Sequence, residues 1–418
     1  MLDRKQAPPF QKNTLLTLLT PQHFKSPKGD DLFVLSGGTQ EVVRVELIAK
    51  AGKWYEPDSG TAHFTASQLD KGTKTKSSFQ LASLFDAYGA HLDVTAGNDF
   101  FTITIYSLSK NLYEVLGVVS ELIHQAVFPE QELLLSKNIA LQNLKVNEEK
   151  TSFLAGKYFR KAIFGEHPYG KELDAQSIEQ VEREKLSTYL KSFLVNFQVI
   201  ASGYVNDHTL KVLTQFLDQL PSGEVKVKEA TFTSPTVVTD YRPKEGSVQS
   251  TIRYGKRIIN RQHPDFFDLL FTTHLLGGYF GSRLMKNIRE DKGLTYGIFS
   301  SVQSLLRESY FIIGADVNRE NRELTMTEIQ KELVKLMQEP VSSNELETAR
   351  NHFIGSLQSE VTTAFAHGDK FKTILLNALP ADYYQQMVNR VSTIRAEDLQ
   401  RCANLYFKTE SFTEVTVG

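Results

Sequence analysis

The stretch QELLLSKNIALQNLK, residues 131–145, is matched by NELETARNHFIGSLQ, residues 344–358, in the second half of this 418-residue chain. Each stretch follows a proline near an expected helix start, Pro129 or Pro340. Matching side chains recur at a constant offset of 213 residues: Glu132 with Glu345, Leu133 with Leu346, Lys137 with Arg350, Asn138 with Asn351 and Leu144 with Leu357. We interpret this offset as an internal duplication, which predicts two related halves.

Segments rich in strand-forming residues predict the sheets of the two halves. In EVVRVELIAK, residues 41–50, Arg44 and Glu46 lie on one side of the strand, and the other side carries Val43, Val45, Leu47 and Ala49. FFTITIY, residues 100–106, is dense in strand formers, and ESYFIIGADV, residues 308–317, is the corresponding run in the second half. Strands mixed with long helices predict an α+β fold of two duplicated domains, each a mostly antiparallel sheet packed against helices, together forming half of a clam-shell.

A segment of turn-forming and charged residues separates the halves. It reads PSGEVKVKEATFTSPTVVTDYRPKEG, residues 221–246, and has little helical periodicity. We therefore predict an N-terminal domain over residues 1–220, a linker over 221–246 and a C-terminal domain over 247–418.

Composition excludes several classes of protein. With 41% hydrophobic and 23% charged residues, the chain is long enough for two separate cores. A net charge of -2 provides no basic field for nucleic acid. The single cysteine, Cys402, excludes an intramolecular disulfide and a cysteine-based zinc cluster. The N-terminus MLDRKQAPPF lacks the apolar region of an export signal, and no run reaches the roughly 18 apolar residues of a membrane span. We expect a cytoplasmic location, or a periplasmic one if the N-terminus has been trimmed.

The segment GTAHFTASQLDKG, residues 60–72, contains a degenerate zinc-binding motif. His63 stands where a motif of the form His-x-x-Glu-His would begin, but Ala66 replaces the general base and Ser67 the second ligand. A catalytic zinc needs three protein ligands and a nearby carboxylate. A lone imidazole does not hold catalytic zinc, so we interpret His63 as a packed or surface histidine without a metal.

The segments around this motif are AGKWYEPDSGTAHF at residues 51–64, KGT at 71–73, LFDAYGAHLDVTAGNDF at 84–100 and HPYG at 167–170. They resemble the first domain of the pitrilysin, insulinase and mitochondrial-processing-peptidase family of zinc peptidases. Residues 249–297, from QSTIRYGKRI to DKGLTYG, give a denser match and resemble the second domain of the family. The resemblance covers nearly the whole chain.

The resemblance implies a third zinc ligand, a glutamate on the next long helix about 76 residues after the second histidine. Counting from Ser67 reaches Asn143, and an amide is a poor zinc ligand beside a carboxylate. Glu148 and Glu149 lie one or two turns further on, so an error in the register would restore one ligand but not three. With Ala66, Ser67 and Asn143 at these positions, we expect the chain to bind no zinc and to be inactive alone.

Arg289 and Tyr296, seven residues apart in IREDKGLTY, lie in the second half. They match an arginine and a tyrosine that peptidases of this family place near the scissile bond from their non-zinc domain. A phenol and a guanidinium can donate hydrogen bonds to the oxyanion that forms when water attacks a peptide carbonyl. The charged run also fits a solvated helix end before the Gly293 turn.

Two glycines precede this pair, in LLGGYFGSRL at residues 275–284. The segment lacks the Gly-x-x-x-x-Gly-Lys pattern of a nucleotide loop. It resembles the loop by which non-catalytic processing-peptidase subunits meet substrate, where Gly277 and Gly278 would let a bound peptide approach the backbone. A helix end packed against the sheet is the alternative.

Two classes of function remain. In the first, this chain is the non-catalytic, substrate-binding or active-site-completing subunit of a heterodimeric zinc metalloendopeptidase, with Arg289 and Tyr296 acting in trans. Its partners would be a peptide substrate and a homologous subunit that carries an intact His-x-x-Glu-His motif and the zinc. In the second, it is a structural paralogue, like the core proteins of respiratory complexes. The retained pair favours the first class.

Overall fold

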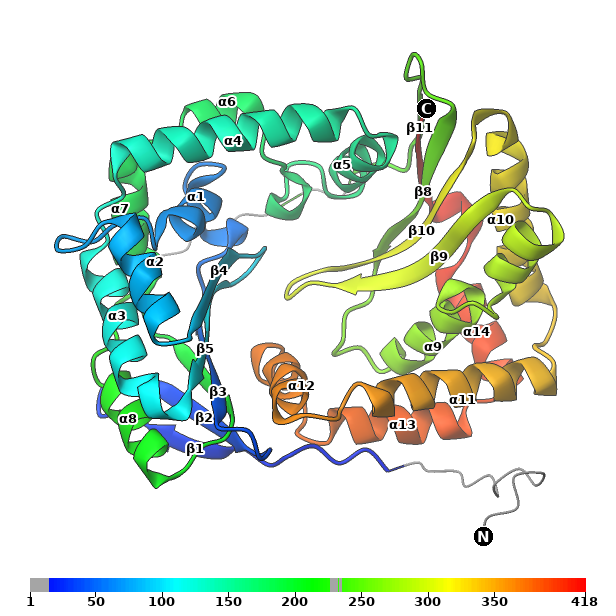
Figure 1. The fold of residues 1–418 in the computed structure, drawn as a ribbon. Helices are drawn as coiled ribbons and strands as arrows, with labels where there is room; N and C mark the ends of the chain where they lie inside the picture. Colours follow the sequence, from blue (N-terminus) through cyan, green and yellow to red (C-terminus); the bar gives the residue numbers. More distant parts are fainter. Residues whose placement is uncertain (1–14, 226–231, 233–234) are drawn as a thin grey trace, which may run out of the picture.

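The structure is a computed structural model that describes residues 15–225, 232 and 235–418. Residues 1–14, on which the expectation of no export signal rests, lie outside the described residues. So do residues 226–231 and 233–234 of the predicted linker. Figure 1 shows two sheets, each packed against helices, so the predicted α+β class is confirmed.

The first sheet has six strands in the order β1-β2-β6-β3-β5-β4. Strands β2 and β6 run parallel, and the other neighbouring strands run antiparallel. The strands are β1 (Gln22–Lys25), β2 (Asp31–Ser36), β3 (Val42–Ala49), β4 (His91–Ala96), β5 (Phe101–Leu108) and β6 (Gln198–Gly203). The strands expected near residues 41–50 and 100–106 are β3 and β5.

The second sheet has five strands in the order β7-β11-β8-β10-β9, which repeats the order β2-β6-β3-β5-β4 strand for strand. The parallel pair is also reproduced, as β7 with β11. The strands are β7 (Thr239–Arg242), β8 (Gln249–Ile258), β9 (Thr295–Ser304), β10 (Ser309–Asn318) and β11 (Thr413–Val417). The common topology supports the duplication, and β7 is a strand of the second sheet although it lies within the predicted linker.

The helices follow the same repeat. Pro129 is the N-cap residue of α4, and α11 begins three residues after Pro340, so both prolines stand at helix starts as expected. The first half contains α1 (Thr61–Gln68), α2 (Ser78–Ala87), α3 (Leu112–Gln125), α4 (Glu130–Glu148), α5 (Thr151–Phe164), α6 (Ala175–Glu179), α7 (Arg183–Phe193) and α8 (Asp207–Leu217). The second half contains α9 (Phe266–Gly277), α10 (Arg322–Gln338), α11 (Ser343–Ser359), α12 (Ala364–Leu376), α13 (Tyr383–Thr393) and α14 (Ala396–Tyr406).

Both faces of β3 are buried, although its sequence alternates. Val43, Val45 and Leu47 pack in the first core, while Arg44 and Glu46 on the opposite face are only 5% and 2% exposed. Helix α12 of the second half covers that face. Lys372 of α12 lies 2.6 Å from the Glu46 carboxylate, and the guanidinium of Arg44 donates to the carbonyl of Phe365 at 2.8 Å. An alternating strand can therefore be buried on both sides when a second domain supplies the partners.

Helices α5 and α12 occupy equivalent places in the repeat, and each packs on the sheet of the other half. Phe159 and Phe164 of α5 pack with Ile312 and Val415 of the second sheet. Phe371 of α12 packs against a group of buried apolar side chains on the first sheet. This reciprocal packing fixes the two halves relative to each other.

The tip between β9 and β10 reaches from the second half into the first (Figure 1). Arg307 at this tip lies 3.1 Å from the carboxylate of Asp99, and its guanidinium is 4.1 Å from the ring centroid of Trp54. Tyr169 donates to the same carboxylate at 2.5 Å. Trp54, Asp99 and Tyr169 come from three segments that resemble the family, so these segments meet at one point and share Arg307 of the second half.

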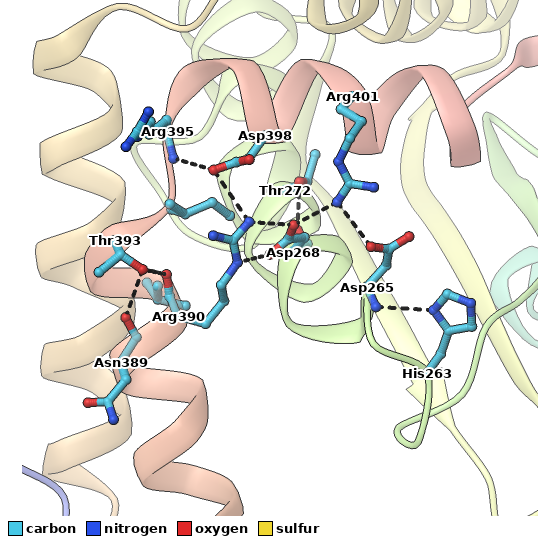
Figure 2. Close-up of polar contacts among 12 residues, drawn as sticks. His263, Asp265, Asp268, Thr272, Asn389, Arg390, Thr393, Arg395, Asp398 and Arg401 are labelled. Atoms are coloured by element: carbon cyan, nitrogen blue, oxygen red, sulfur yellow. Dashed lines mark hydrogen bonds and ion pairs between the residues drawn. The ribbon is translucent and has the colours of Figure 1, made fainter.

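A buried ionic network fixes α9 against α13 and α14 (Figure 2). Asp268 is 4% exposed and accepts two hydrogen bonds from Arg390, at 2.6 and 2.7 Å, and one from Arg401 at 3.0 Å. Asp265 accepts from Arg401 at 3.0 Å and from the phenol of Tyr406 at 2.8 Å. Bidentate pairs of this kind fix geometry as well as charge.

Candidate functional site

Helix α1, which carries the degenerate motif, begins at a glycine and a half-buried carboxylate. Gly60 has a φ of 92°, a left-handed conformation that suits glycine, and an added Cβ there would lie 2.8 Å from Leu173. An oxygen of Glu56 accepts from the backbone N–H groups of Gly60 and Ala62, both at 3.1 Å. Burial raises the pKa of Glu56 to about 7, although these two N–H groups act in the opposite direction.

The three motif positions on α1 have different environments. His63 is exposed, Ala66 is 5% exposed and Ser67 is half-buried. Desolvation lowers the pKa of His63, and the charge of Lys53 lowers it further. The imidazole is open to solvent, and both effects favour its neutral form.

Opposite α1, helix α4 supplies a serine. The hydroxyls of Ser67 and Ser136 lie 3.4 Å apart. Asn143, the counted third position, is exposed and lies seven residues beyond Ser136. Seven residues are about two helical turns, so Asn143 shares a helix face with Ser136 about 10 Å further along the axis.

The residues on α1 and α4 do not fit a catalytic zinc. A methyl group, hydroxyls and an amide replace the carboxylates and the second imidazole that a hydrolytic site requires. Within residues 15–225, 232 and 235–418, no three His, Cys, Asp or Glu side chains form a group that could hold a metal. Glu148 and Glu149 form ion pairs with Lys157 at 3.0 Å and Lys244 at 3.2 Å.

In the second half, Arg289 lies in a seven-residue π-helix, η4 (Met285–Asp291). Asn287 of this helix donates to two buried carboxylates of α10, Glu328 at 3.2 Å and Glu332 at 2.8 Å. Hydrogen bonding from Lys331, the largest favourable contribution, lowers the pKa of Glu328 to about 2. π-Helical turns are rare overall, but those that occur are often at functional sites. This one is anchored by the hydrogen bonds of Asn287 to the two carboxylates of α10.

Arg289 and Tyr296 are held at the two ends of a short connection. The Arg289 guanidinium lies 4.8 Å from the ring centroid of Phe280. The chain then turns at Gly293, with a φ of 62°, and enters β9, where Tyr296 is 93% exposed. The structure thus places the two predicted side chains on adjacent elements and leaves the tyrosine open to solvent.

Gly277 and Gly278 lie at the end of α9, against the sheet. A Cβ on Gly277 would lie 2.6 Å from the backbone nitrogen of Ser300 in β9. A Cβ on Gly278 would lie 2.6 Å from the Cα of His274. Close packing of the helix end therefore explains both glycines, and a role in substrate binding stays a prediction.

The same two glycines line a pocket of about 420 Å³ in the second half. Arg253 of β8 and Asp316 of β10 contribute its charged groups, and Phe280 and Phe299 contribute exposed aromatic rings. Arg253 is not recognisable as a site residue from the sequence. In QSTIRYGKRI it occupies an ordinary polar position of an alternating strand, and its environment depends on residues distant in sequence.

Two family models match this chain. Residues 33–176 match the model described as Insulinase (Peptidase family M16), and residues 180–353 match the Peptidase M16 inactive domain. Together they cover most of the chain, so the protein belongs to the M16 peptidase family, as the sequence resemblance predicted. Within the described ranges, no helix is long and apolar enough to cross a membrane.

Relatives and a solved structure agree with this assignment. An uncharacterized zinc protease of Rickettsia bellii is 26% identical over 392 residues, which cover 90% of this chain and 92% of that protein. The non-peptidase homolog YmxG of Helicobacter pylori is 23% identical over 347 residues, covering 81% and 80%. A crystal structure described as the peptidase M16 inactive domain from Pseudomonas fluorescens has a TM-score of 0.88 at 22% identity, covering 96% of this chain and 98% of that one. The structural likeness shows the same fold.

Proposed function

We propose that this chain is the non-catalytic subunit of a heterodimeric zinc metallopeptidase and that it completes the active site of a homologous partner. The observation that carries the proposal is the contrast in chemistry between the two halves. On α1, Ala66 and Ser67 leave only His63 of the motif. In the second half, Tyr296 is 93% exposed, and Arg289 lies on a π-helix that Asn287 anchors.

The residues of the second half suit a supporting role in peptide hydrolysis. A phenol and a guanidinium are hydrogen-bond donors, and donors fixed before the reaction stabilise an oxyanion without reorganisation. Tyr296 would donate to the carbonyl oxygen of the scissile bond. Arg289 would bind and polarise the peptide, and Asn287 would keep the π-helix in place through Glu328 and Glu332.

The partner must supply what α1 lacks. We infer that it is a homologous subunit with an intact His-x-x-Glu-His motif and that it holds the zinc. Gly277 and Gly278 would allow an extended peptide to approach the end of α9 closely. The name of the Helicobacter pylori relative, a non-peptidase homolog, is consistent with loss of independent activity.

Reconstitution tests the proposal. The candidate partner, this chain and their mixture would each be assayed with a quenched fluorescent peptide library, and the assembly would be followed by light scattering. We expect turnover from the mixture, at most weak turnover from the partner and none from this chain. Arg289→Ala in the assembled complex should raise KM as well as lower kcat. If Arg289→Ala and Tyr296→Phe together leave the complex fully active, the chain is a structural paralogue without a role in proteolysis.

A further inference from the structure

The pocket at the end of α9 contains a guanidinium that forms no salt bridge within the described part of the chain. Among the described residues, no carboxylate lies within 4 Å of the Arg253 side chain, and its one hydrogen bond goes from Nη1 to the carbonyl of Ile252, at 2.9 Å. Arg283, three residues after Phe280, differs because it is bound to Glu345 at 2.7 and 3.0 Å. Arg253 therefore retains hydrogen-bond donors that the protein does not use.

Strand geometry directs Arg253 away from the core. Its neighbours in β8, Ile252 and Tyr254, are 0% and 2% exposed and belong to the core under α9 and α10, so Arg253 lies on the opposite face of the sheet. No nitrogen of Arg253 is among the fully buried side-chain atoms without a partner, so its unused donors are not fully enclosed, and Arg253 lines the pocket.

Gly314 makes room for this arrangement. A Cβ at this position would lie 2.6 Å from the ring of Phe299 and 3.0 Å from Nη1 of Arg253. The aromatic ring and the guanidinium therefore meet above a glycine, at the wall of the pocket. Phe299 is 44% exposed and Phe280 is 58% exposed, so the pocket offers an apolar surface beside the charge.

The neighbouring charges do not neutralise Arg253. Asp316 lines the same pocket, but its carboxylate accepts from the hydroxyl of Thr251 at 2.5 Å, which in turn lies 2.9 Å from the hydroxyl of Thr151. Desolvation lowers the pKa of Arg253; Asp316 raises it, and Arg160 lowers it further. A desolvated guanidinium gains stability from an anionic guest, since a carboxylate can accept two of its N–H groups at once.

We propose that this pocket is a binding subsite for a carboxylate group of a bound peptide, held by Arg253 beside the aromatic rings of Phe280 and Phe299. The proposal rests on the function proposed above, because it names the kind of peptide that this chain would select. Either an acidic side chain or the C-terminal carboxylate of a peptide supplies this chemistry.

The test is peptide binding to the full chain, measured by fluorescence anisotropy with three labelled hexapeptides of otherwise identical sequence. One carries an internal glutamate and a C-terminal amide, the second an internal glutamine and a C-terminal amide, and the third a glutamine and a free C-terminal carboxylate. We expect at least one carboxylate peptide to bind roughly 10- to 100-fold more tightly than the neutral peptide, as a charge-assisted hydrogen bond implies. The peptide that gains affinity identifies the source of the carboxylate.

Three variants test whether the preference for a carboxylate peptide depends on Arg253. Arg253→Gln should remove the preference for the carboxylate, while Arg395→Gln, which changes the net charge equally at an exposed position, should keep it. Asp316→Asn retains the oxygen that accepts from Thr251 and removes a competing charge, so it should tighten binding of the carboxylate peptide by about twofold or more. Circular dichroism and thermal unfolding of each variant show whether it is folded.

Equal binding of all three peptides, or a preference that survives in Arg253→Gln, would overturn the subsite and leave the proposed function standing. Absence of binding by every peptide would contradict peptide recognition by this chain and the subsite with it. A loss of preference in Arg395→Gln as large as that in Arg253→Gln would show only long-range attraction, and would also overturn the subsite.

Discussion

The helix pair α1 and α4 in the first half and the pair α9 and α11 in the second half occupy equivalent places in the duplicated fold, but they carry different chemistry. Between α1 and α4, two serine hydroxyls lie 3.4 Å apart. Between α9 and α11, the imidazoles of His274 and His352 lie 3.2 Å apart, and Tyr279 stacks on His274. The first pair meets through small hydroxyls, whereas the second meets through aromatic rings and is followed along the chain by the two glycines, the π-helix and the exposed Tyr296.

Helices α1 and α9 are also anchored differently at their starts. Helix α1 is fixed at its start by one carboxylate, Glu56, whose pKa is raised to about 7 by burial. Helix α9 is fixed by Asp268, which binds two arginines (Figure 2). The carboxylate at the start of α9 therefore accepts charge-assisted hydrogen bonds from two other helices, whereas the one at the start of α1 accepts only from backbone N–H groups of its own segment.

Restoring the zinc ligands in the first half should have the largest effect on this comparison. In the variant Ala66→Glu, Ser67→His and Asn143→Glu, the side chains at positions 63, 67 and 143 should converge as three zinc ligands. They should bind zinc with a Kd of about 1 μM or tighter, which corresponds to a binding free energy of roughly −8 kcal/mol. Metal analysis and a competition titration with a chelating dye would measure it. A matched variant with Ser136→Glu in place of Asn143→Glu tests the register of α4. Tighter zinc binding by that variant would mean that the count of about 76 residues does not give the ligand position.

Removing the charge of Asp268 should cause the largest loss of stability. Asp268→Asn leaves Arg390 and Arg401 without their buried counter-ion, which should lower the free energy of unfolding by about 3–5 kcal/mol. Asp398→Asn is the control, because Asp398 forms a more exposed pair with Arg390 at 3.3 Å, and should cost about 1 kcal/mol or less. Denaturant unfolding of both variants would measure the difference. Similar losses for the two variants would show that α9 does not depend on the buried network.

A smaller effect is expected for Glu56, and it depends on pH. The pKa of Glu56 in the folded protein, about 7, lies above the ordinary value of 4.5, so the folded state takes up a proton more readily than the unfolded state. The stability that comes from the neutral carboxyl is fully present below pH 4.5 and is lost as the pH rises to about 7. Glu56→Gln keeps a neutral acceptor, so the wild type should lose roughly 1–3 kcal/mol relative to this variant over that range. If the free energies of unfolding of the wild type and of Glu56→Gln change in parallel from pH 4.5 to 7.5, the pKa of Glu56 is not raised.

The sequence predicted more of the fold than of the site. The constant offset of 213 residues and the alternation in residues 41–50 correctly predicted the repeat and β3. The alternation could not show that Arg44 and Glu46 are buried, because the covering helix α12 comes from the other half. Contacts between the halves, such as Arg307 with Asp99, are likewise invisible to local patterns.

For the candidate site, the residue types in the sequence were informative, but the places of the side chains in space could not be predicted from it. The loss of the base and ligands at Ala66 and Ser67 could be seen from the motif alone. The serine opposite Ser67 could not, because it depends on how α4 packs on α1. Arg253 was missed because an arginine in an alternating strand looks like an ordinary exposed residue until Gly314 and Phe299 are placed around it.

We propose that this chain acts through its second half and not through α1. The most direct measurement compares Tyr296→Phe with His63→Ala in the same assembled complex, after both are shown to fold and to co-elute with the partner. We predict that Tyr296→Phe lowers kcat by about 10²- to 10³-fold, the usual cost of one oxyanion donor, with the zinc content of the partner unchanged. His63→Ala should leave kcat unchanged. Loss of kcat in His63→Ala together with full activity of Tyr296→Phe would contradict the account.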